Sequence, residues 1–269
     1  MTLADIIKAI ILGIVEGVTE FLPVSSTAHL LLGGRLLGFE NEGKVFEVVI
    51  QLGAILALLS VYAARLWHLL ITLPSSRETQ RFALGVIVAF LPAGIVGATF
   101  HDYITGVRFE SLALISLAMI LGGFVLLWLD RMPLTPRHTD VMAFPLRLCL
   151  GIGLFQTLSL VPGVSRAGAT IVGALLLGTD KRSAAEYSFY LAMPTLAGAF
   201  VYDLYKNGAS LDGGAVAIIA IGFVVAFLSA FVVVKTLLDF VSRFGFAPFA
   251  YWRLIVGGLG LIAAFTVAA

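Results

Sequence analysis

EGVTEFLPVSSTAH, residues 16–29, places carboxylate, hydroxyl and imidazole side chains between flanks that are almost wholly aliphatic. Pro23 and the serines after it interrupt an apolar segment that runs over residues 5–38. A helix broken inside lipid exposes unpaired backbone groups at several kcal/mol each, so a break is tolerated only where protein or a water-filled cavity surrounds it. The stretch therefore predicts a re-entrant helical hairpin that lines a polar site.

The composition shows what surrounds this stretch. Of the 269 residues, 60% are hydrophobic and 12% are charged, whereas an ordinary soluble domain has about 25% charged residues. Mean hydropathy is +1.04. Apolar stretches of the roughly 20 residues that cross a bilayer recur along the chain, which predicts an all-α polytopic membrane protein with one integral-membrane domain over residues 1–269. A net charge of +1 argues against a nucleic-acid partner. Six stretches are expected to be full crossings: 45–64, 82–100, 111–129, 184–201, 213–234 and 250–266.

A second broken segment lies over residues 148–178, where VPGVSRAGAT (161–170) interrupts the apolar sequence. A shift of 140 residues aligns the two segments, and their breaks coincide. Such self-similarity is typical of an internal repeat, with halves at about 1–135 and 140–269. The aligned pairs include Gly13 with Gly153, Val24 with Val164, Ser25 with Ser165, Gly33 with Gly173, and Gly38 with Gly178; Glu16 falls opposite Gln156.

Basic residues orient the two halves. By the positive-inside rule, loops rich in arginine and lysine are cytoplasmic. Three crossings separate the two hairpins, so the first hairpin enters from the outer side and the second from the inner side. The prediction is an inverted-topology repeat whose polar breaks meet near the bilayer midplane. The basic loops lie near 65–81, 131–147 and 235–253, the last including Arg253, and the loops with one basic residue each lie near 101–110 and 203–212.

Two acidic residues stand four apart in the first break. Glu16 and Glu20 share one face of a helix, where two carboxylates repel unless a cation or a shared proton separates them. Mg²⁺ prefers such oxygen ligands and often completes its shell with substrate phosphate, and Ca²⁺ is the alternative. The competing interpretation is a solvated pair at the outer rim, but Glu at membrane depth is costly and functional by default. We therefore expect a divalent-cation site on Glu16 and Glu20.

The hydroxyls of the first break suggest a nucleophile. Ser26 and His29 are three residues apart, within reach of a hydroxyl–imidazole pair if a helix restarts here. Ser25 is expected to cap this second half-helix and to offer its hydroxyl to a ligand. Capping by Ser26, and a structural role for His29, are the alternatives. Thr27 is counted among the candidate substrate contacts.

The second break has the composition of an anion cradle. Gly163 and Gly168 allow close backbone approach, Ser165 and Thr170 supply hydroxyls, and the following half-helix directs backbone N–H groups at the cavity. Arg166 adds a planar fork of donors suited to two phosphate oxygens. The alternative is that Arg166 pairs with a glutamate of the first break and locks the hairpins together.

One more polar pair lies on the third apolar segment. Glu47 and Gln51 are four residues apart and are expected to face the same cavity, with packing or a partner polar group as the alternative. Gln51 is therefore counted among the candidate substrate contacts.

Four stretches together resemble one family. EGVTEFLPVSSTAH, FEVVIQLGAILA (46–57), PGVSRAGAT (162–170) and FAPFAYWR (246–253) are similar to the undecaprenyl-diphosphate phosphatase family of bacterial inner membranes, often called bacitracin-resistance proteins. The similarity runs over essentially the whole chain, and the first and third stretches are highly specific together.

The resemblance implies removal of one phosphate from undecaprenyl diphosphate, giving the lipid carrier of peptidoglycan synthesis. It also implies divalent-metal dependence and an active site that opens to the periplasm. The family's E/Q-x-x-x-E motif falls on Glu16 and Glu20, its serine and histidine on Ser26 and His29, and its P-G-x-S-R motif on 162–166, with Thr170 closing the stretch. Two positions depart: Ala28 replaces a usual glycine, and Ala167 replaces a usual serine, which puts in doubt any hydroxyl role at 167.

The main competing function is a transporter or flippase for a lipid-linked phosphate or another anion. Inverted repeats and broken helices are typical of transporters, and Arg166 with half-helix N-termini would bind an anion without cleaving it. Transport needs no nucleophile, so Ser26 and His29 favour the phosphatase. An intramembrane serine protease would leave Arg166 and the paired glutamates without a role. Membrane lipids are expected partners, and a homo-oligomer stays open.

Overall fold

A computed structural model describes residues 2–39, 45–99, 111–207 and 213–267, and these ranges contain helices and no β-strand. The predicted all-α class is confirmed. The side chains of 203–207, 213–215 and 267 are not described, so the expected weakly basic loops near 101–110 and 203–212, with Arg108 and Lys206, lie outside the described residues apart from the last turn of a helix.

The first broken segment forms a helical hairpin. Helix α1 (Leu3–Thr19) begins with a capping box in which Thr2 and Asp5 exchange backbone and side-chain hydrogen bonds. After the break at Pro23, helix α2 (Ser26–Leu37) runs back and ends at Gly38, whose φ of +54° favours glycine.

The second broken segment forms a similar hairpin. Helix α8 (Leu146–Gln156) continues into a short 3-10 helix, η2 (Thr157–Leu160), and helix α9 (Arg166–Leu176) runs back after the break. Gly178 follows α9 with a φ of +96°, as Gly38 follows α2. The two breaks therefore lie where the sequence predicted them.

Longer helices make up the rest of the molecule. Helices α5, α7, α11 and α12 are long and apolar enough to cross a membrane, and α3 and α4, bent by 67° at their junction, count as a fifth if the pair is one span. The chain is thus an integral membrane protein by its helices. The bounds are α3 (Val45–Val61), α4 (Ala63–Thr72), α5 (Arg77–Thr99), α7 (Leu112–Arg131), the 3-10 helix η1 (Val141–Ala143), α10 (Lys181–Asn207), α11 (Gly213–Phe244) and α12 (Ala247–Val267).

The expected count of six crossings exceeds what length and hydropathy support in the described residues. Helix α3 has 17 residues and ends at a bend. Helix α10 is long, but Lys181, Arg182 and Glu186 fall in its first turns and lower its hydropathy. Four or five membrane-capable helices are found, and the count of six stays a prediction.

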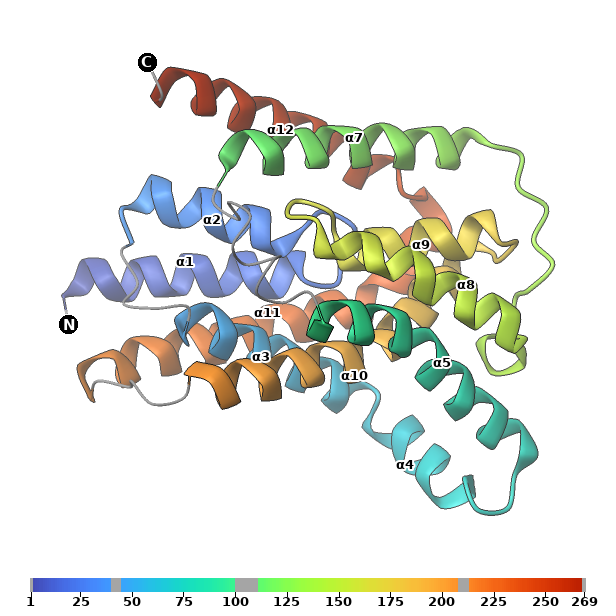
Figure 1. The fold of residues 1–269 in the computed structure, drawn as a ribbon. Coiled ribbons are helices and arrows are strands. Elements are labelled where there is room, and N and C mark those ends of the chain that lie inside the picture. The colour runs from blue at the N-terminus through green and yellow to red at the C-terminus, as the bar shows by residue number, and fades with distance from the viewer. Residues whose placement is uncertain (1, 40–44, 100–110, 208–212, 268–269) are drawn as a thin grey trace.

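The two hairpins enter the molecule from opposite ends. In Figure 1 the α1–α2 hairpin enters from the left and the α8–α9 hairpin from the right, and their tips lie near the middle. Helices α7 and α12 pack together along one side of the tips, while α3 and α11 pack together on the other. Other parts of the protein therefore cover most of both breaks, although Val161 at the start of the second is 44% exposed. Such cover is needed because backbone groups left unpaired in lipid are costly.

Aligned glycines make equivalent close contacts. A Cβ on Gly13 of α1 would lie 2.6 Å from the carbonyl oxygen of Gly222 in α11, and a Cβ on Gly153 of α8 would lie 2.3 Å from that of Ala89 in α5. Only glycine permits such backbone approach. Each hairpin's first arm thus packs directly on one long helix, α1 on α11 and α8 on α5.

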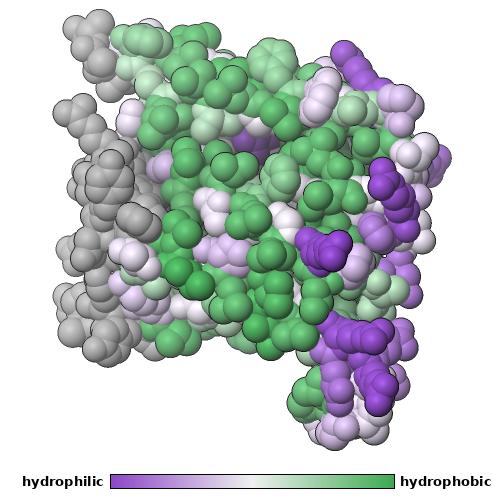
Figure 2. All heavy atoms as spheres, turned by 45° about the vertical axis from the view of Figure 1, so that its right-hand side comes forward, coloured by the Kyte–Doolittle hydropathy of each residue, from purple (hydrophilic) through white to green (hydrophobic). Residues whose placement is uncertain are grey.

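The surface is arranged in zones. Figure 2 shows a broad apolar area across the face in view and hydrophilic side chains gathered along its right-hand edge. Exposed large apolar side chains such as Trp128, Leu228 and Ile255 would be costly in water but not in lipid. The exposed apolar surface is therefore consistent with a belt of side chains that faces lipid.

Candidate active site

A cavity of about 90 Å³ lies where the two hairpin tips meet. Its lining is rich in hydroxyl and charged side chains, and most of the predicted site residues contribute to it. It unites side chains of both breaks, which are some 140 positions apart in the sequence. The lining residues are Glu20, Ser25, Ser26, Thr27, Gln51, Ser159, Val164, Ser165, Arg166 and Leu196.

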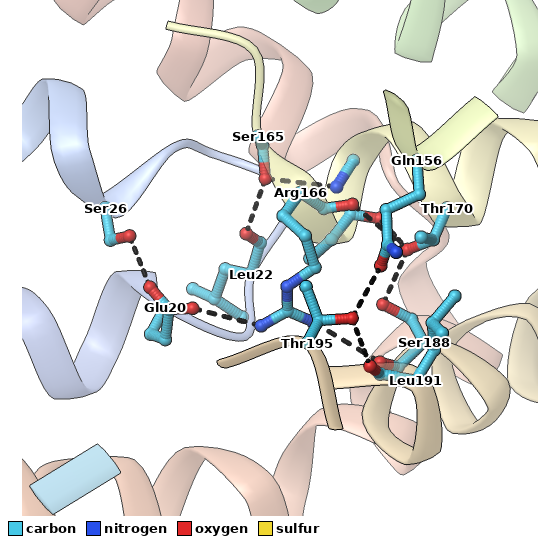
Figure 3. Close-up of polar contacts among 12 residues, drawn as sticks. Glu20, Leu22, Ser26, Gln156, Ser165, Arg166, Thr170, Ser188, Leu191 and Thr195 are labelled. Atoms are coloured by element: carbon cyan, nitrogen blue, oxygen red, sulfur yellow. Dashed lines mark hydrogen bonds and ion pairs between the residues drawn. The ribbon is translucent and has the colours of Figure 1, made fainter. Parts of the chain in front are cut away.

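Glu20 joins the two hairpins. Its Oε2 accepts a 2.5 Å hydrogen bond from the Ser26 hydroxyl, and its Oε1 lies 3.0 Å from Nη2 of Arg166 (Figure 3). The side chains of the ion pair are only 4% and 10% exposed. An ion pair so shielded from water is costly to break from one side, because the remaining charge is left buried. The structure therefore contains the ion pair between Arg166 and a glutamate of the first break that was the alternative interpretation of the sequence.

The expected Ser26–His29 pair is not found. Nδ1 of His29 lies 2.7 Å from the backbone oxygen of Ser25, and Trp252 donates its indole N–H to Nε2 at 2.7 Å. Because Nε2 accepts, the neutral imidazole carries its proton on Nδ1 and donates to Ser25. His29 is turned toward α12, and the base nearest to Ser26 is Glu20.

Ser25 stands at the N-cap of α2 but makes no capping hydrogen bond with its side chain, so that expectation was wrong. Its φ of +73° is a left-handed conformation that is strained for a residue with a Cβ. The bond from His29 holds its carbonyl in this turn, and the turn presents both serines to the cavity.

The capping role falls on Ser165 in the second hairpin. Its hydroxyl accepts from the backbone N–H of Gly168 at 3.0 Å and donates to the carbonyl of Leu22 at 3.3 Å (Figure 3). The same side chain thus starts α9 and links it to the first tip.

Glu16 is not among the residues that line the cavity. It is 1% exposed, and its Oε1 finds no hydrogen-bond partner among the described residues. Glu20 follows Glu16 by one helical turn at the end of α1, so the two carboxylates repel each other when both are ionised. An unpartnered buried carboxylate oxygen is unusual and indicates a bound proton or cation.

Three residues expected to contact substrate lie outside the lining: Gly163, Gly168 and Thr170. Thr170 is fully buried, and its hydroxyl bonds to the carbonyl of Arg166 and, at 2.8 Å, to the hydroxyl of Ser188. Ser188 in turn accepts from Nη1 of Arg166 at 3.3 Å through its carbonyl. Thr170 and Ser188 therefore position Arg166 through hydrogen bonds and do not line the cavity.

Arg253 is a buried side chain beside the site that the sequence did not predict. Arg253 was counted in a cytoplasmic loop, but α12 begins at Ala247, so Arg253 lies inside the helix bundle and is 2% exposed. Its guanidinium donates to the carbonyls of both breaks, Pro23 at 3.1 Å and Gly163 at 3.2 Å. It also donates to two carbonyls of α7. The apolar sequence on both sides of Arg253 was the signal that could have revealed it.

We expect Arg253→Ala to lower the free energy of unfolding by at least about 3 kcal/mol, since it leaves several buried carbonyls without donors. Thermal unfolding in detergent measures the effect. Arg243→Ala, at an exposed arginine near the end of α11, is the matched control and should leave the midpoint nearly unchanged. Equal midpoints for the two variants would contradict a tie between the tips.

The described residues hold no group of three or more His, Cys, Asp or Glu side chains placed to bind a metal ion. Glu16 and Glu20 remain a pair of neighbouring carboxylates. Mg²⁺ is often held by one or two carboxylates together with substrate phosphates and water, so a pair is compatible with such a site.

Fold and cavity define an integral membrane protein with a buried, charged site between two broken helical hairpins. Comparison with known proteins makes this class specific. The chain belongs to the family described as "Bacitracin resistance protein BacA", which matches residues 9–259. The family resemblance inferred from the sequence is confirmed.

Two curated relatives are similar along nearly their whole length. "Undecaprenyl-diphosphatase 1" of Agrobacterium fabrum (strain C58 / ATCC 33970) is 60% identical over 259 residues, which cover 96% of this chain and 97% of the relative. "Undecaprenyl-diphosphatase" of Caulobacter vibrioides (strain NA1000 / CB15N) is 60% identical over 257 residues, with the same coverage.

Proposed function

We propose that the protein removes the terminal phosphate of undecaprenyl diphosphate and releases undecaprenyl phosphate and inorganic phosphate. Relatives named for this substrate are 60% identical over almost the full chain. The observation that carries the proposal is Glu20, which joins a hydroxyl and a guanidinium inside one buried cavity. Phosphoryl transfer needs chiefly positioning and charge neutralisation, and these groups supply both.

The site supplies a nucleophile, a base and an anion-binding arginine. The Ser26 oxygen attacks the terminal phosphorus while Glu20 takes its proton, so an Oγ–phosphorus bond forms as the anhydride bond breaks. Glu20 passes the proton to the departing undecaprenyl phosphate and is a carboxylate again. Glu20 then deprotonates a water molecule, whose oxygen bonds to phosphorus as the Oγ–phosphorus bond breaks. Phosphate leaves, and the proton held by Glu20 returns to Ser26. Arg166 donates two N–H groups to phosphate oxygens and offsets their charge. His29 acts through Ser25 as a positioning residue.

Glu16 and Glu20 would hold a divalent cation, with Mg²⁺ as the first candidate and Ca²⁺ as the alternative. The unpartnered oxygen of Glu16 supports this assignment. When bound, such an ion neutralises charge on the phosphate oxygens. It also relieves the repulsion between the two carboxylates.

The test is phosphate release by the purified protein in detergent, from a long-chain prenyl diphosphate. We expect turnover that is lost on treatment with EDTA and restored by Mg²⁺. Binding without phosphate release would instead favour the transporter or flippase. Turnover that is unaffected by EDTA would contradict the cation site alone.

Replacing the nucleophile separates a serine route from direct attack by water. We expect Ser26→Ala to reduce kcat by at least about 1,000-fold, because a covalent route has no substitute for its nucleophile. Ser60→Ala, which removes a hydroxyl that bonds to the Ala57 carbonyl in α3, is the control and should keep wild-type rates. Wild-type kcat in Ser26→Ala would mean that Glu20 activates water directly.

The membrane arrangement is proposed in the same way. The protein crosses the bacterial inner membrane six times, its halves at about 1–135 and 140–269 form an inverted repeat, and the cavity opens to the periplasm. Equivalent packing of Gly13 and Gly153 supports the repeat, and hairpins that enter from opposite ends support its inversion (Figure 1).

A further inference from the structure

A larger cavity lies beside the charged one. It has a volume of about 410 Å³ and is formed by α5, η2 and α10. Its lining is mostly apolar, with several glycine and alanine positions that leave it wide. We call it the α5–α10 groove, defined by Phe90, Gly94, Leu160, Gly198, Ala199 and Tyr202.

The groove lies next to the charged cavity. Ser159 of η2 lines both spaces. On α10, Thr195 lines the groove and its neighbour Leu196 lines the charged cavity. The two spaces are therefore adjacent, and a molecule bound at Arg166 would have to pass Ser159 to extend into the groove.

The charged cavity is polar and the groove is apolar, and the two ends of a lipid phosphate differ in the same way. The charged cavity is small and polar, and it suits a diphosphate. The groove is larger and apolar, and it suits a hydrocarbon chain, for which burial is worth roughly 25 cal/mol per Å² of apolar surface. A prenyl diphosphate combines both properties in adjoining groups.

We propose that the α5–α10 groove binds the first prenyl units of the substrate, next to the diphosphate. The inference rests on the proposed function and adds to it the place where the chain is recognised. Small residues on α5 and α10 give room for the methyl branches of the chain, and the Phe90 ring forms one wall. Recognition of these units would let the enzyme distinguish prenyl diphosphates from diphosphates without a chain.

Gly198 offers the sharpest test. A Cβ at this position would lie 3.6 Å from the Phe90 ring, an ordinary contact, so a larger side chain begins without a clash. Leucine also favours a helix more than glycine does. Gly198→Leu should therefore fill the groove and leave α10 intact. Gly258→Leu on α12, where a Cβ meets nothing within 4 Å, is the matched control.

The experiment compares two substrates by phosphate release: a long-chain prenyl diphosphate and methyl diphosphate, which carries no prenyl unit. For Gly198→Leu we expect KM for the long chain to rise by about tenfold or more. The rates on methyl diphosphate should stay within about twofold of the wild type, as should the rates on both substrates with Gly258→Leu. An unchanged KM for the long chain overturns the proposal.

A second measurement uses the wild-type protein and so does not depend on whether Gly198→Leu folds. The wild-type protein is irradiated with a photoreactive prenyl diphosphate whose reactive group lies in the first units, and labelled peptides are identified. Labelling of peptides that contain Phe90 or Ala199, competed by long-chain prenyl diphosphate but not by phospholipid, supports the groove. Labelling confined to α12, or competed equally by phospholipid, overturns it. A wild type that cleaves neither substrate refutes the proposed function, whereas cleavage with no effect of Gly198→Leu refutes the groove alone.

Discussion

Arg166→Ala is expected to lower kcat/KM for a prenyl diphosphate by at least about 1,000-fold, the range in which an arginine acts on a transferred phosphoryl group. The side chain reaches across from the second hairpin and lies 3.0 Å from Glu20 in the first. The substitution removes the N–H donors that would bind phosphate. It also leaves the buried Glu20 carboxylate without its positively charged partner, the Arg166 guanidinium. Phosphate release by the purified variant measures the loss.

Arg166→Lys sharpens the prediction, because lysine keeps the charge but not the planar fork. We expect it to recover only a small part of the lost activity. Arg182→Ala is the control: its ion pair with Asp239 involves side chains that are 50% and 80% exposed, and such pairs contribute little. Rates near wild type in Arg166→Ala would remove the arginine from the reaction.

Glu20→Gln is expected to reduce kcat by about 100- to 10,000-fold, the contribution typical of a positioned general base. Glutamine keeps the size of the side chain and can still accept hydrogen bonds, so the fold should survive. It cannot take a proton from Ser26, and it no longer balances the charge of Arg166. Single-turnover phosphate release tests the chemical step directly.

The matched control for Glu20→Gln is Glu186→Gln, since Glu186 pairs with Arg65, whose side chain is 46% exposed. This variant should keep the wild-type kcat. If both variants keep it, water or Ser26 is activated by another group, and Glu20 has only the structural role of holding the tips together.

The two hairpins could be predicted because their signals are local. Pro23, and Gly163 with its φ of +88°, lie among serines at the two breaks, whereas Pro92 and Pro194 lie inside the helices α5 and α10. Acidic and basic side chains inside apolar segments marked the same places as functional. A shared cavity then followed from the opposite orientation of two similar segments, and the ion pair between Arg166 and Glu20 was foreseen as one of two interpretations.

The pairings inside the site could not be predicted, because they depend on long-range packing. Spacing favoured Ser26 with His29, since neighbours on a helix meet whenever no other partner intervenes. In the structure α12 brings Trp252 to His29, a partner 223 positions away, and Glu20 reaches Ser26 across the break. Nothing in a short motif encodes which of several polar neighbours a side chain meets.

Arg253 was missed for a related reason. Its position near the start of an apolar segment resembled a positively charged loop, and charge statistics do not distinguish a solvated arginine from one that binds four backbone carbonyls. Burial decides between these interpretations, and burial is a property of the packed molecule.

A double-mutant cycle tests most directly whether the two hairpins build one site around one diphosphate. It compares kcat/KM of the wild type, Glu20→Gln, Arg166→Ala and the double variant. Residues that act on the same phosphoryl group as a unit are strongly non-additive, so we predict that the double variant is no slower than the slower single variant. Losses that multiply would show that Glu20 and Arg166 act independently, and would contradict a shared site.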